Sequence, residues 1–88
     1  MPCYLISYDQ HAPGNHEKLT QTIKGYGTWA RILESTWAVV TEDPATKVRD
    51  SLQSYLENSE GLVVMQSSGV AAWAGVFPDV SEWLKAAL

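Results

Sequence analysis

Apolar and polar residues alternate along the chain in a way that separates four strand-like segments from three helix-like ones. The strand-like segments are short and rich in β-branched and aromatic residues. They cover residues 3–8, 28–33, 36–41 and 62–65. Glu34-Ser35 is predicted to be a tight turn or bulge between the second and third, with a single bent strand as the alternative. The first and last segments are apolar enough to predict buried strands, and the last is expected to be covered on both faces.

Apolar residues recur at helical spacing in two segments of the first sixty residues. The first helix is predicted from an N-cap at Asn15 to about Lys24, where glycines follow. The second is predicted to be capped by Asp43, with Pro44 at its first position, and to stop near Asn58.

The C-terminal part of the chain is predicted to end in a third helix. Pro78-Asp79 marks its start, and Asp79 and Glu82 have the spacing of a capping box. Residues 70–77 before it fit either an edge strand or a turn of helix.

The order of these elements is β-α-β-β-α-β followed by a C-terminal tail helix. This order is typical of the ferredoxin-like, or split βαβ, arrangement. We therefore expect an α+β sandwich in one domain over residues 1–88, with two helices on one face of a four-stranded antiparallel sheet. The other face must be covered by solvent, by the tail or by a second copy.

Charge and size narrow the classes of partner. The 88-residue chain carries a net charge of −4, and its pI is about 4.9. This is the wrong sign for a non-specific nucleic-acid binder, which needs cations to displace phosphate counterions. RNA or DNA is therefore a partner that the charge disfavours. The chain also has four Trp and four Tyr, more than a small core needs, and a homodimer interface would bury some of them.

Cysteine usage and hydropathy indicate the compartment. The single cysteine, Cys3, cannot form an internal disulfide and lies in an apolar strand, so a buried thiol is expected. No segment resembles a secretory signal, and none approaches the roughly 18–20 apolar residues of a membrane span. We therefore expect a cytoplasmic protein with no membrane partner.

Three residues are candidates for chemistry. Asp9 ends the first strand where the chain turns to loop residues, a place suited either to a metal or to a loop-capping hydrogen bond. His11 could serve as a general acid or base because the pKa of histidine lies near neutrality, or it could be a solvated loop residue. Ser35 has no neighbouring His or Asp pattern that would activate it, so strand packing is its alternative role.

The chain resembles the CRISPR-associated Cas-two-like superfamily, most closely its stand-alone SinR-family proteins and more distantly the VapD toxins. The resemblance lies in the order and spacing of several segments along nearly the whole chain. These are Tyr4 to Asp9, Leu33 to Trp37, Leu62 to Met65, Ala71 to Gly75 and Ser81 to Leu84.

The resemblance implies a ferredoxin-like homodimer in which the acid that ends the first strand meets its symmetry mate. Asp9 is the matching position, and Ser35 matches the serine of the family's second-strand signature. Two facing carboxylates can hold Mg²⁺, which would activate water for phosphodiester hydrolysis. The nucleic-acid binders of the family often carry arginines near the first loop, where this chain has Gln10 and His11.

Two functions follow as alternatives. One is a homodimeric, metal-dependent endonuclease that uses Asp9, with His11 and Ser35 beside it. The other is a non-catalytic oligomeric module of a defence or toxin–antitoxin system, which binds a protein partner or a small nucleotide ligand. Trp29 and Trp37 could stack on bases in the first case or pack against the sheet in both.

Overall fold

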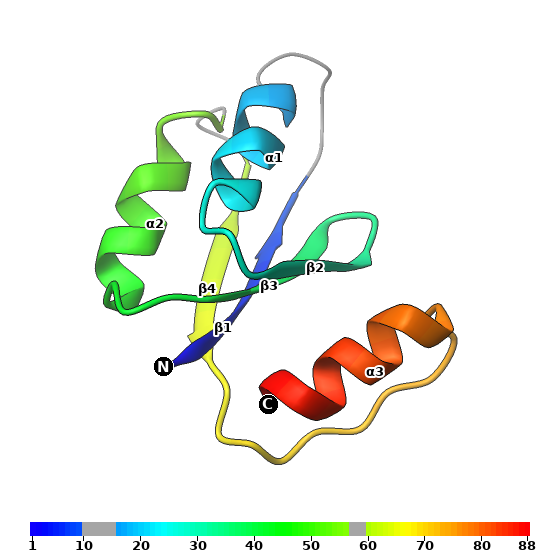
Figure 1. The fold of residues 1–88 in the computed structure, drawn as a ribbon. Coiled ribbons are helices and arrows are strands. Elements are labelled where there is room, and N and C mark those ends of the chain that lie inside the picture. Colours follow the sequence, from blue (N-terminus) through cyan, green and yellow to red (C-terminus); the bar gives the residue numbers. More distant parts are fainter. Residues whose placement is uncertain (10–15, 57–59) are drawn as a thin grey trace.

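Four strands form one antiparallel sheet with helices on both of its sides (Figure 1). The structure is a computed structural model and describes residues 1–9, 16–56 and 60–88. Its elements are β1 (Cys3–Tyr8), α1 (His16–Lys24), β2 (Trp29–Leu33), β3 (Thr36–Val40), α2 (Ala45–Gln53), β4 (Leu62–Gln66) and α3 (Pro78–Ala87). The sheet order β2-β3-β1-β4 confirms the predicted ferredoxin-like α+β fold with a C-terminal helix.

Strand β1 lies in the middle of the sheet and directs alternate side chains to opposite faces. Ile6 is opposite Trp37 on β3 and Val64 on β4, and this face lies beneath α1 and α2. Leu5 is opposite Ala38 and Met65 on the other face. Central position and burial of alternate residues confirm that β1 is the core strand.

The core lies between the sheet and the first two helices. Leu19 and Ile23 of α1 and Val48 and Leu52 of α2 are fully buried, each at the helical spacing predicted for it. Tight packing of such side chains against Ile6 supplies most of the apolar burial in a domain of this size.

Trp37 is the largest side chain in this core and is only 1% exposed. Its indole N–H donates a hydrogen bond to the Tyr8 hydroxyl over 3.2 Å, which satisfies a buried donor. The Trp29 ring lies against the Trp37 ring, with 5.5 Å between their centroids. The Arg31 guanidinium lies over the Trp37 ring, 5.0 Å from its centroid. Trp37 therefore joins β1, β2 and β3 on the helix side of the sheet.

The turn at Glu34-Ser35 separates β2 from β3, so the alternative of one bent strand is wrong. The pairing of the two strands shifts register between Arg31 and Leu33. Arg31 donates two hydrogen bonds to the Glu34 carbonyl, at 2.7 and 3.1 Å, and these close the turn.

The start of α2 differs from the prediction. Pro44, not Asp43, is the N-cap, and its carbonyl accepts the Val48 N–H at 3.1 Å. Asp43 forms an ion pair with Lys47 at 3.5 Å instead of capping the helix.

Helix α2 also ends at Gln53, earlier than predicted. The next residues form a tighter turn, in which the Tyr55 and Leu56 N–H groups reach carbonyls only three residues back. The predicted stop near Asn58 lies outside the described residues, as do the predicted cap Asn15 and the candidate His11.

The C-terminal arm, residues 67–77, is neither strand nor helix. Helix α3 follows it with Phe77 as N-cap and Pro78 at its first position, so the predicted capping box of Asp79 is wrong. Pro78 has no N–H to satisfy, and Asp79 lies in the first turn, where its charge suits the helix dipole. In the described part of the chain no helix is both long and apolar enough to cross a membrane.

The prediction that β4 is covered on both faces is also wrong. Val63 is 51% and Met65 58% exposed, because α3 packs against β2 at the opposite edge of the sheet.

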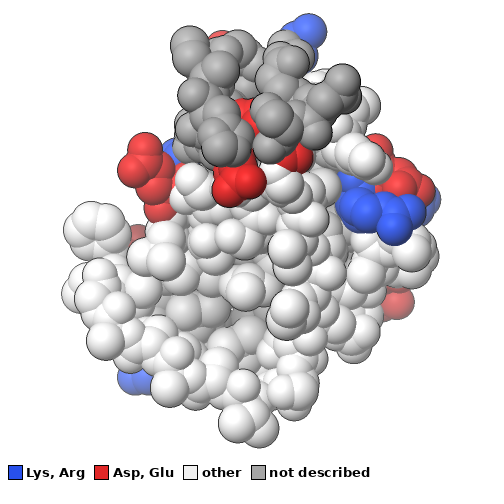
Figure 2. All heavy atoms as spheres, turned by 180° about the vertical axis from the view of Figure 1, so that it is seen from behind, with Lys and Arg blue, Asp and Glu red and all other residues white. Residues whose placement is uncertain are grey.

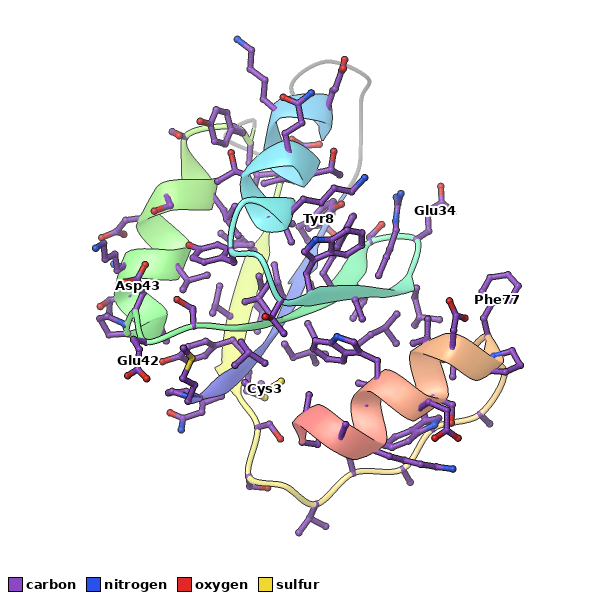
Figure 3. The ribbon with its side chains drawn as sticks, viewed as in Figure 1. Cys3, Tyr8, Glu34, Glu42, Asp43 and Phe77 are labelled. Atoms are coloured by element: carbon purple, nitrogen blue, oxygen red, sulfur yellow. The ribbon has the colours of Figure 1, made fainter. Side chains whose placement is uncertain are left out.

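Figure 3 shows Tyr8 at one end of β1 near the helices and Cys3 at the other end, beside the C-terminus of α3.

Truncation of one buried and one exposed leucine tests the assignment of the core. We expect Leu52→Ala, at a fully buried position, to lower the free energy of unfolding by about 2–5 kcal/mol because it leaves a cavity. Leu33 is 57% exposed, and Leu33→Ala is the matched control with an expected loss of less than about 1 kcal/mol. Urea unfolding measures both, and equal losses would contradict the assignment of the core.

Candidate functional site

Asp9 is held at the end of β1 by two hydrogen bonds to Gly61. Its N–H donates to the Gly61 carbonyl at 3.0 Å, and its carboxylate Oδ2 accepts the Gly61 N–H at 3.0 Å. A Cβ at position 61 would lie only 3.1 Å from that oxygen, so the close approach favours glycine. The carboxylate thereby extends the pairing of β1 and β4 by one residue beyond the sheet.

Ser35 lies on the opposite side of the same strand end. Its carbonyl accepts the Tyr8 N–H at 3.2 Å, and the residue is half-buried. The structure thus places Ser35 and Asp9 on either side of the end of β1, Ser35 toward β3 and Asp9 toward β4. Of the three candidates, His11 lies outside the described residues.

The described residues at this strand end fit a structural role better than a complete metal site. Mg²⁺ requires six oxygen ligands in octahedral geometry and is usually held by one or two carboxylates with waters or phosphates. Within residues 1–9, 16–56 and 60–88, no three or more His, Cys, Asp or Glu side chains are grouped to hold a metal ion. Among these residues, Asp9 is thus not part of a group of three or more such side chains.

Two tryptophans and two cations form a cluster near the β2 edge. The Lys24 Nζ lies 5.3 Å from the Trp29 ring centroid and 6.0 Å from that of Trp37. Trp37 is buried, so its ring is closed to a base, whereas Trp29 is half-exposed. Such cation–π contacts stabilise the helix side of the sheet and leave Trp29 at the surface.

A shallow hollow of about 530 Å³ lies next to this cluster, between β2 and the start of α3. Trp29 and Arg31 form its strand side, and Phe77 and Trp83 form its helix side. Aromatic residues and arginine are the types enriched where proteins bind one another.

The face of the sheet opposite α1 and α2 exposes large apolar side chains. Leu5, Val63 and Met65 project from it and are 39%, 51% and 58% exposed. Figure 2 shows this side as a broad uncharged surface, hollowed in its middle, with charged side chains gathered at its margins.

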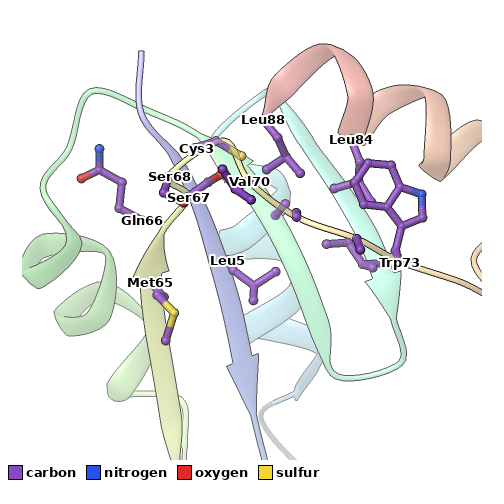
Figure 4. A pocket seen from close by; sticks show the side chains of 14 residues that line it. Cys3, Leu5, Met65, Gln66, Ser67, Ser68, Val70, Trp73, Leu84 and Leu88 are labelled. Atoms are coloured by element: carbon purple, nitrogen blue, oxygen red, sulfur yellow. The ribbon is translucent and has the colours of Figure 1, made fainter.

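The hollow in this face is a cavity of about 320 Å³. The sheet forms its floor, and the C-terminal arm and the end of α3 form its walls (Figure 4). The Trp73 indole on one wall is fixed by a 3.1 Å hydrogen bond from its N–H to the Ser81 hydroxyl of α3. The described residues that line the cavity include no charged side chain.

Cys3 lies at the floor of this cavity and is 6% exposed. Burial raises the pKa of its thiol, because the thiolate is poorly solvated there. This confirms the predicted buried thiol.

Sequence reasoning left open whether solvent, the tail or a second copy covers the second face of the sheet, and it did not predict the cavity there. A signal was nevertheless present, because residues 66–78 contain no charged residue although they connect two surface elements. Connecting segments of soluble domains are usually polar, so a run of this composition indicates a covered surface.

Comparison of the chain with protein-family models, curated proteins and solved structures gave no significant match. The resemblance to Cas-two-like proteins therefore stays a prediction.

We expect Asp9→Ala to destabilise the fold by about 1 kcal/mol, because the Gly61 N–H loses its acceptor. Asp50→Ala is the matched control. Asp50 pairs with its exposed neighbour Arg49, so its loss should change stability by less than about 0.5 kcal/mol. Urea unfolding of both variants measures the difference, and an Asp9 variant as stable as the control would show that the carboxylate has no structural role.

The raised pKa of Cys3 predicts a slow thiol. At pH 8 the native protein should react with an aromatic disulfide reagent at least about tenfold more slowly than the urea-unfolded chain, since thiolate is the reactive form. Absorbance of the released thiol measures both rates. Equal rates would mean that the C-terminal arm and α3 do not shield Cys3.

Proposed function

We propose that the protein acts as a homodimeric, non-catalytic binding module of the Cas-two-like type. The observation that carries this proposal is the uncharged sheet face around Leu5, Val63 and Met65. Contiguous exposed apolar surface on a protein often marks an interaction site. A second copy covers it without bringing like charges together, which matters for a chain of net charge −4.

The geometry of Asp9 supports the binding module over the endonuclease. Its carboxylate accepts the Gly61 N–H and joins β1 to the start of β4, which is the loop-capping role. Nucleic acid, the substrate of an endonuclease, is also disfavoured by the acidic charge.

The partner we favour is a protein that binds at the β2 edge. The hollow between Trp29, Arg31 and Trp83 combines aromatic surface with a guanidinium, the residue types that dominate binding energy in protein interfaces. It lies away from Leu5 and Met65, so a dimer formed through the open face would leave it accessible.

Light scattering coupled to size-exclusion chromatography tests the dimer. We expect twice the 9.7 kDa mass of the chain at micromolar concentration. A Met65→Asp variant should shift the protein to monomer, because it places a charge in the apolar face, whereas Gln53→Asp on the exposed side of α2 should remain dimeric. A monomeric wild-type protein would overturn the proposal.

Nuclease assays test the alternative function. RNA and DNA are incubated with wild-type protein and Asp9→Asn in the presence of Mg²⁺ or Mn²⁺. We expect no cleavage that depends on Asp9. Cleavage by the wild type that Asp9→Asn abolishes, while the variant stays folded and dimeric, would make the protein an enzyme.

A further inference from the structure

The outer edge of β2 lies in the hollow beside α3. Trp29, Ala30 and Arg31 all line this hollow. Side chains of consecutive strand residues point to opposite faces of a sheet, so a hollow that all three residues line lies at the edge of the strand and not over one face. Strand β2 is an end strand of the sheet, and this edge is the one away from β3.

The hydrogen-bond pattern of the sheet fixes which backbone groups face this edge. The Val40 N–H donates to the Thr28 carbonyl at 2.9 Å, and the register of β2 with β3 makes these two residues a hydrogen-bonded pair. Bonded and non-bonded pairs alternate along an antiparallel ladder. Ala30, two residues beyond Thr28, is therefore bonded to β3, whereas the N–H and C=O groups of Trp29 and Arg31 point outward.

The pairing of β3 with β1 leads to the same pattern independently. The Tyr8 N–H donates to the Ser35 carbonyl at 3.2 Å, and the same alternation turns the backbone groups of Trp37 toward β1. Trp37 is opposite Arg31, so its N–H and C=O face away from β2. The outward groups of Trp29 and Arg31 are those that an added strand can bond.

The helix wall of the hollow is apolar. Phe77, Val80 and Trp83 lie three residues apart at the start of α3 and line the hollow together. Phe77 is 76% exposed. Across from them Ala30 carries only a methyl group, which leaves room for a larger side chain. Residues opposite one another in a ladder share a face, so an apolar residue opposite Ala30 would enter this space.

The other face of an added strand would lie beside two cations. The Lys24 Nζ is 5.3 Å from the Trp29 ring centroid, and the Arg31 guanidinium lies over the Trp37 ring on the same side of the sheet. Acidic side chains opposite Trp29 and Arg31 would form opposite-charge pairs there. Asp79 lies on the helix wall and disfavours an acid on that side.

We propose that the β2 edge binds its protein partner by strand addition. An extended segment of the partner pairs antiparallel with residues 29–31 and lies between β2 and α3. It has acidic residues opposite Trp29 and Arg31 and an apolar residue between them. In this mode main-chain hydrogen bonds supply affinity and side-chain pockets supply specificity. The inference rests on the protein partner proposed for the β2 edge and names the class of segment that binds there.

Two capped, fluorescein-labelled peptides test the side-chain pattern, one of sequence Glu-Leu-Glu-Leu-Glu and one with Lys in place of each Glu. Fluorescence anisotropy should show that the acidic peptide binds at least about tenfold more tightly. The protein's net charge of −4 by itself favours the basic peptide, so the opposite preference reports the groove. Equal binding, tighter binding of the basic peptide or no binding of the acidic one overturns the inference.

Backbone methylation tests the strand addition itself. In the proposed register the Glu amides of the acidic peptide point toward β2 and the Leu amides point away. N-methylation of the central Glu should weaken binding at least about tenfold, whereas N-methylation of a neighbouring Leu should change it by less than about twofold. Equal losses from both overturn strand addition. No loss from either indicates a segment bound without main-chain pairing, which overturns it as well.

A protein variant locates the peptide in the hollow. Phe77→Ala should weaken binding of the acidic peptide at least about fivefold, because the apolar residue loses an aromatic wall. Val70→Ala is the matched control, since Val70 is 90% exposed and lies on the C-terminal arm outside this hollow. Its binding should equal that of the wild type. Circular dichroism confirms that both variants are folded, and equal affinities would overturn the placement.

Light scattering on the same samples separates this inference from the proposed homodimer. A dimeric protein that fails the peptide tests overturns strand addition and leaves the homodimer intact. A monomeric protein that binds the acidic peptide and loses it in Phe77→Ala overturns the homodimer and supports strand addition.

Discussion

The structure depends on the burial of one face of β1 beneath α1 and α2. Ile6 and Tyr8 on that face pack with Trp37, and the Tyr8 hydroxyl accepts a hydrogen bond from the buried Trp37 indole N–H. Leu19 and Ile23 of α1 and Val48 and Leu52 of α2 belong to the same buried cluster. A side chain that fits it poorly would loosen α1, α2 and three strands together.

Because successive side chains of a strand point to opposite faces, the burial of one face of β1 also fixes which side chains lie on the other. Once Ile6 points to the helices, Leu5 must point away from them, together with Met65 across the ladder. The first two helices cover the Ile6 side, and the C-terminal arm and α3 lie over the half of the opposite face that holds Ala30 and Ala38. Val63 and Met65 on the remaining half stay more than half exposed.

The end of β1 shows how a residue suited to chemistry can serve the fold. Asp9 was a candidate metal ligand because a carboxylate follows a buried strand, yet its oxygen binds the Gly61 backbone. The same pair of residues joins β1 to β4, the strand that carries the exposed Val63 and Met65. Asp9 thus supports the surface proposed for dimerisation without being part of it.

The sequence by itself determined the order of elements, the central place of β1 and the buried stripes of α1 and α2, because periods of two and 3.6 residues are local properties of the chain. It did not determine helix caps: Asp43 and Asp79 have good capping chemistry, but the backbone placed the prolines and their neighbours at the helix starts. Only the tertiary structure decided which apolar residues are covered. Met65 and Ile6 both lie in apolar strands, and what distinguishes them is the layer packed above each, which depends on how segments far apart in the chain meet.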